Sequence, residues 1–431
     1  MPWSEQQIVA AAPDAASVAA GRKLAVPGPW SETGASDSLL WGRCQGSGST
    51  PYQVSVDLLA PAYRCTCPSR KFPCKHAIAL LLLWSAGAIG ESGDTAGFAQ
   101  SWAELREKRS RARGASTEDA APADPEAQAR RQQDRVAKMD AGIAEFSLWL
   151  TDLGRAGLAD ARARDRSWWD TAAARLVDAQ LPALAEQVRD AAGAIRAGLG
   201  DSELLQLVGR WWMLARAWSV RETLSAEEQA DLRAALGWPV PTAEVRAGEV
   251  VTGTWLVTGA HRDLDGRLQQ QRTWLRGEDG EHVVVNEVAG PGGALGTPQL
   301  AGTRLRATLA LYPGSRPRRA LFVDPATPLE PSRDLGPTTD IASALTAAAA
   351  QLAVAPWRDR FPVTLGGLRI SADPEPTVVD AAGDGLPAAP GTDLTALLAL
   401  TGGAPCSAFG EIEAGRFRIL SLVIDGEVTA L

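Results

Sequence analysis

The pattern of apolar and polar positions divides the chain into regions of different secondary structure. Over residues 52–58 apolar side chains alternate with polar ones, which predicts a half-buried strand, and residues 63–65 are expected to run back beside it. The apolar run over 76–84 predicts a buried helix that follows directly. Residues 1–92 are therefore expected to form an N-terminal module that combines strands with helices.

Charged residues, Ala and Pro dominate residues 93–130, which offer few large apolar side chains for a core. A basic stretch over 106–113 precedes several acidic residues, so the segment is expected to be a solvated or partly helical linker. A basic arm that contacts nucleic acid is the alternative. Residues 131–237 then show apolar side chains at helical spacing and predict an all-helical domain. Its tryptophan pairs are expected to pack in the core, because Trp among Leu at this spacing is typical of packing.

From residue 238 the period becomes that of strands, and residues 238–330 predict a β-rich domain. The expected strands cover 251–258, 268–275, 281–288, 303–311 and 320–323, joined by Asp-Gly and Pro-Gly turns. Such short strands in succession indicate a small barrel or a sandwich. An oligonucleotide-binding barrel is one possible fold of this class. The number of strands alone does not distinguish it from the others.

The last region, 331–431, returns to α+β structure. Asp340 is expected to cap a helix that carries Ile341, Leu345 and Leu352 on one face. Further strands are predicted at 363–370, 406–411, 417–424 and 428–431, with a short helix over 393–400. The chain is thus predicted to be a multidomain α+β protein with a β-hairpin and helix module, a central all-α region, and C-terminal β-rich and α+β regions.

Composition narrows the classes of function. The chain has 431 residues and a formal net charge of −8, which argues against a dedicated basic nucleic-acid binder. It shows neither a basic leader segment nor an apolar run of about 20 residues, so we expect a cytoplasmic protein without a membrane partner. The chain holds 5 cysteines, and three of them crowd into residues 65–74, a spacing typical of a metal site rather than of a disulfide framework.

The candidate ligands are Cys65, Cys67, Cys74 and His76. Three thiolates and one imidazole satisfy a closed tetrahedral zinc site. Cys65 and Cys67 should share one side of an extended strand, because alternate residues of a strand point the same way. Cys74 and His76 would enter from the start of the following helix. All four can then converge on one structural Zn²⁺ ion, which has no open position for a reacting water.

This pattern, Cys-x-Cys-x6-Cys-x-His preceded by Gly46-Ser47 and an alternating strand from Tyr52, resembles the SWIM-type zinc finger. The resemblance covers about residues 40–86 and implies that the four residues named above are the zinc ligands. It further implies a role in binding DNA or protein. By likeness to stand-alone bacterial members, it also suggests partnership with an AAA+ ATPase or a von Willebrand A-domain system.

Four basic residues surround the motif: Arg64, Arg70, Lys71 and Lys75. A zinc ion with three thiolates carries a charge of −1 (+2 − 3), so these cations are expected chiefly to compensate the site and keep the thiolates ionised. The alternative is a patch that contacts phosphates or a partner. Cys44, Cys406, His261 and His282 lack further ligands at metal spacing and are expected to be packed or surface residues.

No motif of a nucleotide-binding loop or of a known catalytic centre occurs in the sequence. We therefore expect a non-enzymatic adaptor whose zinc finger presents a protein-binding surface. A protein that binds DNA or RNA through the basic face of the finger is the alternative.

Overall fold

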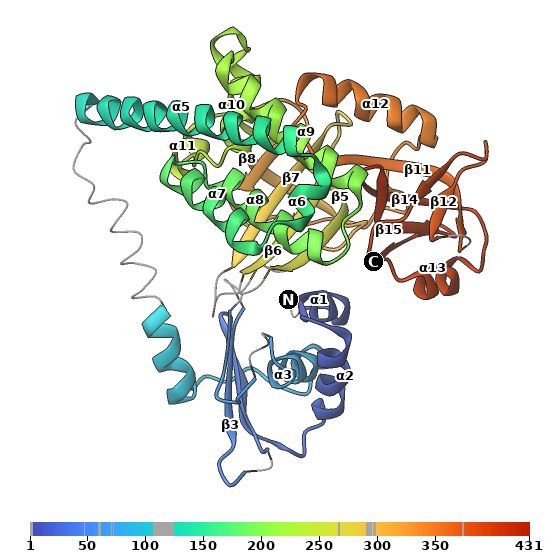
Figure 1. Ribbon diagram of the computed structural model, residues 1–431. Coiled ribbons are helices and arrows are strands. Elements are labelled where there is room, and N and C mark those ends of the chain that lie inside the picture. Colours follow the sequence, from blue (N-terminus) through green and yellow to red (C-terminus); the bar gives the residue numbers. More distant parts are fainter. Residues whose placement is uncertain are drawn as a thin grey trace. The chain divides into compact units, whose positions relative to one another are not determined.

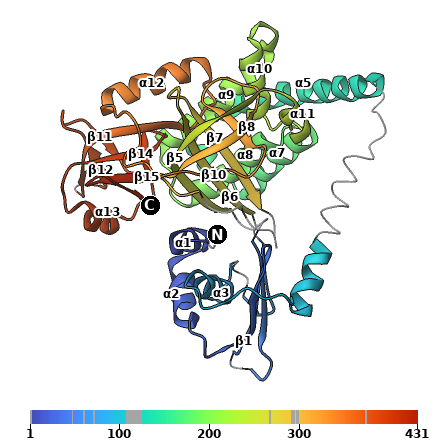
Figure 2. The ribbon, with the colours of Figure 1, turned by 180° about the vertical axis from the view of Figure 1, so that it is seen from behind.

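The computed structural model describes residues 3–46, 48–58, 62–69, 71, 73–106, 125–265, 268–289, 295, 299–372 and 375–431 (Figures 1 and 2). The chain divides into two compact units. The first consists of Met1–Pro122 with Ala260–Thr273 and Asn286–Leu300, and the second of Ala123–Gly259, Trp274–Val285 and Ala301–Leu431. Among the described residues, no helix is both long and apolar enough to cross a membrane.

The first unit is built on an antiparallel sheet in the order β1-β2-β3-β4. Its strands are β1 (Trp30–Ala35), β2 (Leu39–Cys44), β3 (Tyr52–Asp57) and β4 (Ala62–Cys65). Its helices are α1 (Glu5–Ala11), α2 (Ala15–Leu24) and α3 (Lys75–Ser85), and the side chains of Ser4 and Asp14 cap the first two. Helix α3 is almost entirely apolar, and its Ile78 and Leu81 share a core with Val54 and Val56 of β3.

The segment expected to be a linker begins with a helix over residues 97–106. Its fully buried Ala99 packs with Leu39 and Trp41 of β2, and Phe98 and Trp102 lie against the same cluster. At the other end, α5 already begins at Pro125. Helix at both ends agrees with a partly helical segment, whereas the packing of residues 97–106 against β2 is not expected, because two aromatic residues supply apolar contacts that the charged composition conceals.

The basic stretch expected over 106–113 lies outside the described residues except for Arg106. Its guanidinium forms an ion pair of 3.3 Å with Asp57 and lies 5.4 Å from the ring centroid of Trp102. This one member of the stretch is thus engaged with the first unit.

The second unit contains the predicted helical region. Its principal helices are α5 (Pro125–Ala156), α6 (Leu158–Ala163), α7 (Arg166–Asp178), α8 (Pro182–Arg196), α9 (Asp201–Ser219), α10 (Ala226–Ala235) and α11 (Thr242–Ala247). Trp169 and Trp211 are buried among leucines in one core, as predicted, whereas Trp212 is exposed. Ser225 and Glu228 form a capping box at the start of α10.

The predicted strands of the β-rich region close into a barrel. They are β5 (Val250–Asp265), β6 (Leu268–Gly277), β7 (His282–Ala289), β8 (Arg304–Leu311) and β9 (Arg318–Phe322), with β10 (Thr327–Pro328) paired to β8 at the edge. They lie in the order β8-β5-β6-β7-β9, the β7–β9 pair is parallel, and β9 pairs again with β8. Of the two predicted forms the barrel is therefore correct, and its strand order is that of oligonucleotide-binding barrels.

A second sheet covers part of the outside of this barrel. It has the order β13-β12-β11-β14-β15-β16 and consists of β11 (Phe361–Ser371), β12 (Thr377–Val379), β13 (Gly385–Pro387), β14 (Cys406–Glu413), β15 (Arg416–Ile424) and β16 (Glu427–Ala430). Trp274 and Val284, on the outer face of β6 and β7, share a core with Phe409 and Leu420 of this sheet. The face that an oligonucleotide-binding barrel uses, formed by its second and third strands, is thus packed inside the unit.

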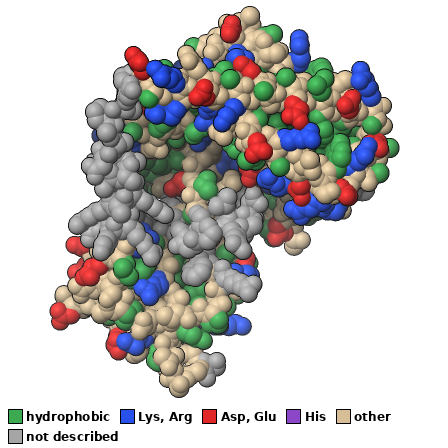
Figure 3. All heavy atoms as spheres, turned by 60° about the vertical axis from the view of Figure 1, so that its left-hand side comes forward, with side chains coloured by type: hydrophobic (Ala, Val, Ile, Leu, Met, Phe, Trp, Pro, Cys, Tyr) green, Lys and Arg blue, Asp and Glu red, His purple; other side chains and the backbone are tan. Residues whose placement is uncertain are grey.

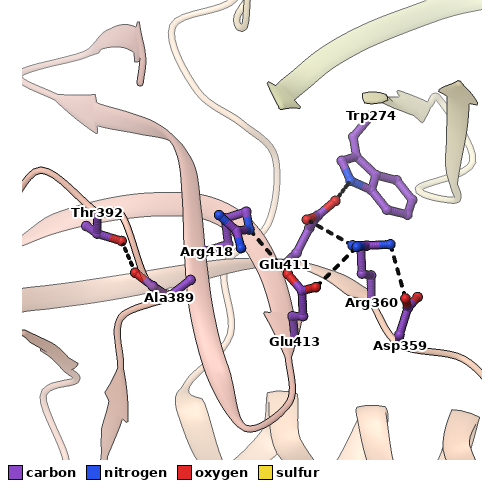
Figure 4. Close-up of polar contacts among 8 residues, drawn as sticks. All are labelled: Trp274, Asp359, Arg360, Ala389, Thr392, Glu411, Glu413 and Arg418. Atoms are coloured by element: carbon purple, nitrogen blue, oxygen red, sulfur yellow. Dashed lines mark hydrogen bonds and ion pairs between the residues drawn. The ribbon is translucent and has the colours of Figure 1, made fainter. Parts of the chain in front are cut away.

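A buried carboxylate lies at this junction (Figure 4). Glu411 is 0% exposed, and its Oε1 accepts a hydrogen bond of 2.6 Å from Nε1 of Trp274. Arg360 lies 3.9 Å from the other oxygen of Glu411 and forms further ion pairs with Glu413 and Asp359. Because a buried charge is costly without partners, this contact favours one fixed arrangement of barrel and sheet.

Helix α12 (Ile341–Val354) is capped by Asp340 as predicted, and its spacing places Ile341, Leu345 and Leu352 on one side. This side is buried only in part. Ile341, Ala344 and Ala348 are buried against the second sheet, whereas Leu345 and Leu352 are 40% and 39% exposed. The stripe that the sequence predicts therefore exists, but its two leucines are not in the core.

The junction between barrel and sheet can be tested with two glycines of β5. A Cβ atom added at Gly259 would lie 2.7 Å from Cβ of Leu420 and 2.9 Å from Cδ1 of Phe409, whereas at Gly253 the nearest atom is 4.0 Å away. We expect Gly259→Ala to lower the free energy of unfolding by about 1–3 kcal/mol through overpacking. Gly253→Ala should change it by less than about 0.5 kcal/mol. Urea unfolding measures both, and equal effects would contradict this packing.

Candidate metal centre

Two elements of the first unit position the four predicted zinc ligands. Cys65 ends β4, where it lies opposite Val54 of β3, and Cys67 follows in the bend after the strand. Cys74 is the N-cap residue of α3, and His76 lies in the first turn of that helix. The sequence predicts Cys65 and Cys67 on one strand, but only Cys65 lies on it. The second pair enters from the helix start as predicted.

The ligand atoms of these four residues all lie within 4.8 Å of one another. Nδ1 of His76 is 3.7 Å from Sγ of Cys65 and 4.0 Å from Sγ of Cys74. A tetrahedral zinc ion with bonds of about 2.3 Å to sulfur and 2.0–2.1 Å to nitrogen holds such atoms about 3.6 Å apart. The donor set and its spacing therefore fit one zinc ion, and Cys65, Cys67, Cys74 and His76 are positioned to bind it.

The surroundings of the ligands prepare one thiol for metal binding. Hydrogen bonds from the Cys65 thiol and from His76, together with backbone N–H groups at the start of α3, lower the pKa of Cys74. The bond to Cys74 and burial raise the pKa of Cys65. Because the thiolate is the form that binds zinc, Cys74 is the first of these two sulfurs to reach its binding form.

Tyr52 completes the shell around the imidazole. Its ring centroid lies 5.0 Å from that of His76 at an interplanar angle of 39°. Such a contact restrains the orientation of the imidazole, on which its coordination depends. The sequence indicates only that Tyr52 is the first residue of an alternating strand. Nothing in it indicates that Tyr52 contacts the imidazole of His76.

The basic residues around the motif do not act as one group. Lys71 forms an ion pair of 2.6 Å with Asp14, the N-cap residue of α2, and this contact together with backbone N–H donation from Ser17 lowers the pKa of Asp14 to about 2. Arg64 on β4 and Lys75 on α3 are exposed and form no ion pair with the residues that the structure describes. Arg70 lies outside the described residues.

The ion pair between Lys71 and Asp14 links the metal-binding loop to α2. Beside it lies a groove of about 740 Å³, whose walls include Ala16 and Ala20 of α2, Tyr52, Lys75, and the ligands Cys67 and His76. Two zinc ligands therefore form part of the groove surface, and the shape of the groove depends on the metal site.

The remaining candidates are structural. Cys44 and Cys406 are buried free thiols, and burial raises the pKa of each. His282 stacks on Phe409 and contacts the edge of Trp274, and burial lowers its pKa to about 4. His261 is half-buried on β5. Within the described residues, no cluster of His, Cys and carboxylates other than the four ligands has the spacing of a metal site.

Comparison with known protein families identifies two regions. The SWIM zinc finger matches residues 52–84, which contain all four ligands. The SWIM-associated four-helix bundle domain matches residues 134–236, the helical region from α5 to α10. No curated protein and no solved structure shows significant similarity to the chain.

We expect the purified protein to contain one zinc ion per chain. Cys74→Ser should lose this ion, because it removes one of the four ligands of a closed site. Since zinc binding contributes on the order of 10–16 kcal/mol to the folding of small finger modules, the first unit should also become sensitive to protease. Elemental analysis and limited proteolysis measure the two effects.

Cys44→Ser is the matched control, because Cys44 is a buried thiol of the same sheet that is not among the ligands. It should retain zinc. A metal-free native protein, or equal zinc loss in both variants, would contradict the assignment.

Proposed function

We propose that this chain, a SWIM-type zinc finger protein, is a non-enzymatic adaptor whose zinc module binds another protein in the groove beside the metal. The observation that carries the proposal is the composition of this groove, whose walls include the ligands Cys67 and His76. Four protein ligands leave the zinc ion no position for a substrate, so its role is to shape the module. A groove of this size with apolar and polar walls suits the side chains of a partner protein.

The coupling between loop and helix supports this role. One wall of the groove is α2, and the opposite wall carries the metal ligands. Lys71 and Asp14 hold the two together by their ion pair, which is partly exposed and contributes modestly to stability. Metal binding thereby controls the shape of the surface without taking part in a reaction.

The partner that we propose first is an AAA+ ATPase or a protein with a von Willebrand A domain, present in the cytoplasm. This choice rests on resemblance to stand-alone bacterial SWIM proteins alone. The four-helix bundle and the β domains would supply further surfaces of contact.

The adaptor role can be tested with two exposed alanines of α2. Ala16 lines the groove, whereas Ala19, on the same helix, does not. Ala16→Glu should reduce capture of a stoichiometric partner from native cytosol at least tenfold, because the new side chain fills the groove. Ala19→Glu should leave capture unchanged. Quantitative mass spectrometry of the captured proteins gives the ratio.

The comparison requires that both variants retain zinc, and elemental analysis measures their zinc content. Equal capture by Ala16→Glu and wild type, or absence of any stoichiometric partner, would contradict the proposal.

The second candidate function is binding of DNA or RNA, favoured by Arg64 and Lys75 near the metal site, which are exposed and form no ion pair within the described part of the chain. Against it stand the ion pair of Lys71, the covered outer face of the barrel and the mixture of charges elsewhere. On the helical part of the second unit, Lys and Arg side chains are interspersed with Asp and Glu (Figure 3).

Nucleic-acid binding predicts a mobility shift that weakens steeply between about 50 and 200 mM salt and is reduced by Lys75→Glu. Ala19→Glu serves here as the control for a carboxylate added away from the groove; it changes the net charge by −1, whereas Lys75→Glu changes it by −2. Absence of a shift at low salt would exclude this function, and a shift insensitive to Lys75→Glu would exclude the finger face as its site.

A further inference from the structure

A second groove, of about 490 Å³, lies within the second unit between α9 and α12. Both views show these two helices side by side (Figures 1 and 2). Phe361 of β11, Ile412 of β14 and Gly415 in the turn before β15 close its third side. The groove is therefore bounded on three sides, and apolar side chains line each of them beside a few polar ones.

The side chains along this groove are apolar yet exposed. Leu345 and Leu352 of α12 are 40% and 39% exposed, and Met213 of α9 is 45% exposed. Ile341 and Ala344, nearer the start of α12, and Ala348, between the two leucines, are buried against the second sheet. The described chain therefore covers the apolar side of α12 only in part.

Each wall presents residues at the spacing by which helices pack. On α9 these are Gln206, Gly209, Arg210 and Met213, and on α12 Leu345, Ala348, Ala349 and Leu352. Both sets follow the positions i, i+3, i+4 and i+7, which form one stripe on an α-helix. Ala348 and Ala349 in the middle of the α12 stripe and Gly209 in the α9 stripe are small, so a third helix can approach between the larger side chains.

The charges of the groove favour an acidic occupant. Arg358 is engaged with Ser315 and Asp231, and the carboxylate of Asp359 with Arg360. Arg210 is half-buried and has no hydrogen-bond or ion-pair partner among the residues that the structure describes. The groove therefore carries one uncompensated positive charge at an apolar wall, where a carboxylate would bind more strongly than in water.

We propose that this groove docks an amphipathic helix of a partner protein, with an Asp or Glu that pairs with Arg210. The apolar stripe of such a helix would contact Leu345, Leu352 and Met213, in the mode by which grooves between helices recognise helical segments. The surface lies wholly within the second unit and does not involve the zinc site.

The probe is a displayed library of 18-residue helical peptides with apolar residues fixed at i, i+3, i+4 and i+7 and all other positions random. Selection on the full-length protein should enrich sequences with Asp or Glu beside the apolar stripe. Met213→Glu should reduce their recovery at least tenfold. Leu205→Glu is the matched control, because Leu205 is an exposed apolar residue of α9 outside the groove, and it should leave recovery unchanged.

Selection on Arg210→Glu should replace the acidic residues by Lys or Arg, an exchange that a general loss of folding does not produce. No enrichment over the unselected library, equal recovery on Met213→Glu and wild type, or no change of charge preference on Arg210→Glu would overturn the proposal. Sedimentation of the protein alone tests whether the groove binds a second copy of the chain. If the protein self-associates and Met213→Glu abolishes that association, the groove is an interface between copies and the proposal is overturned.

Discussion

The N-terminal module depends on the convergence of four ligand atoms within 4.8 Å of one another. Two ligands come from the end of a hairpin and two from the start of a helix, so neither element can form the site alone. The apolar contacts of α3 with Val54 and Val56 hold these elements together. Conversely, partly buried thiols and an imidazole brought so close are poorly solvated, and a metal ion relieves that cost. Core and metal site therefore stabilise each other.

A different constraint organises the second unit. A barrel whose strand order is that of oligonucleotide-binding proteins has its outer face covered by a sheet, and the buried Glu411 joins the two through Trp274. The carboxylate has its partners only when barrel and sheet meet in this register, so the contact selects one arrangement rather than adding much stability. The barrel thus contributes a scaffold, which illustrates that a fold alone does not define a binding site.

The sequence predicts those features that local patterns determine. Alternation and turn residues locate β3 and the barrel strands, the capping residue Asp340 marks the start of α12, and ligand spacing identifies the four residues of the metal site. Features that depend on distant contacts are not predicted. Nothing near Asp14 indicates its pairing with Lys71, 57 residues away. The packing of the helix over 97–106 is not predicted, because its contacts Leu39 and Trp41 lie on a strand far earlier in the chain. The closure of the barrel likewise depends on the return of β9 to β8.

Helix α12 shows what sequence periodicity can and cannot say about burial. The spacing of Ile341, Leu345 and Leu352 correctly predicts one apolar stripe, but it does not say how much of the stripe is covered. In the structure Ile341, Ala344 and Ala348 are buried against the second sheet, whereas Leu345 and Leu352 remain exposed. These two leucines line a groove whose other wall is an equally spaced stripe of α9. Since each exposed leucine carries the hydrophobic cost of contact with water, the stripe is most stable when it is covered. The exposed part of the stripe therefore indicates where the folded chain has apolar surface left for another molecule.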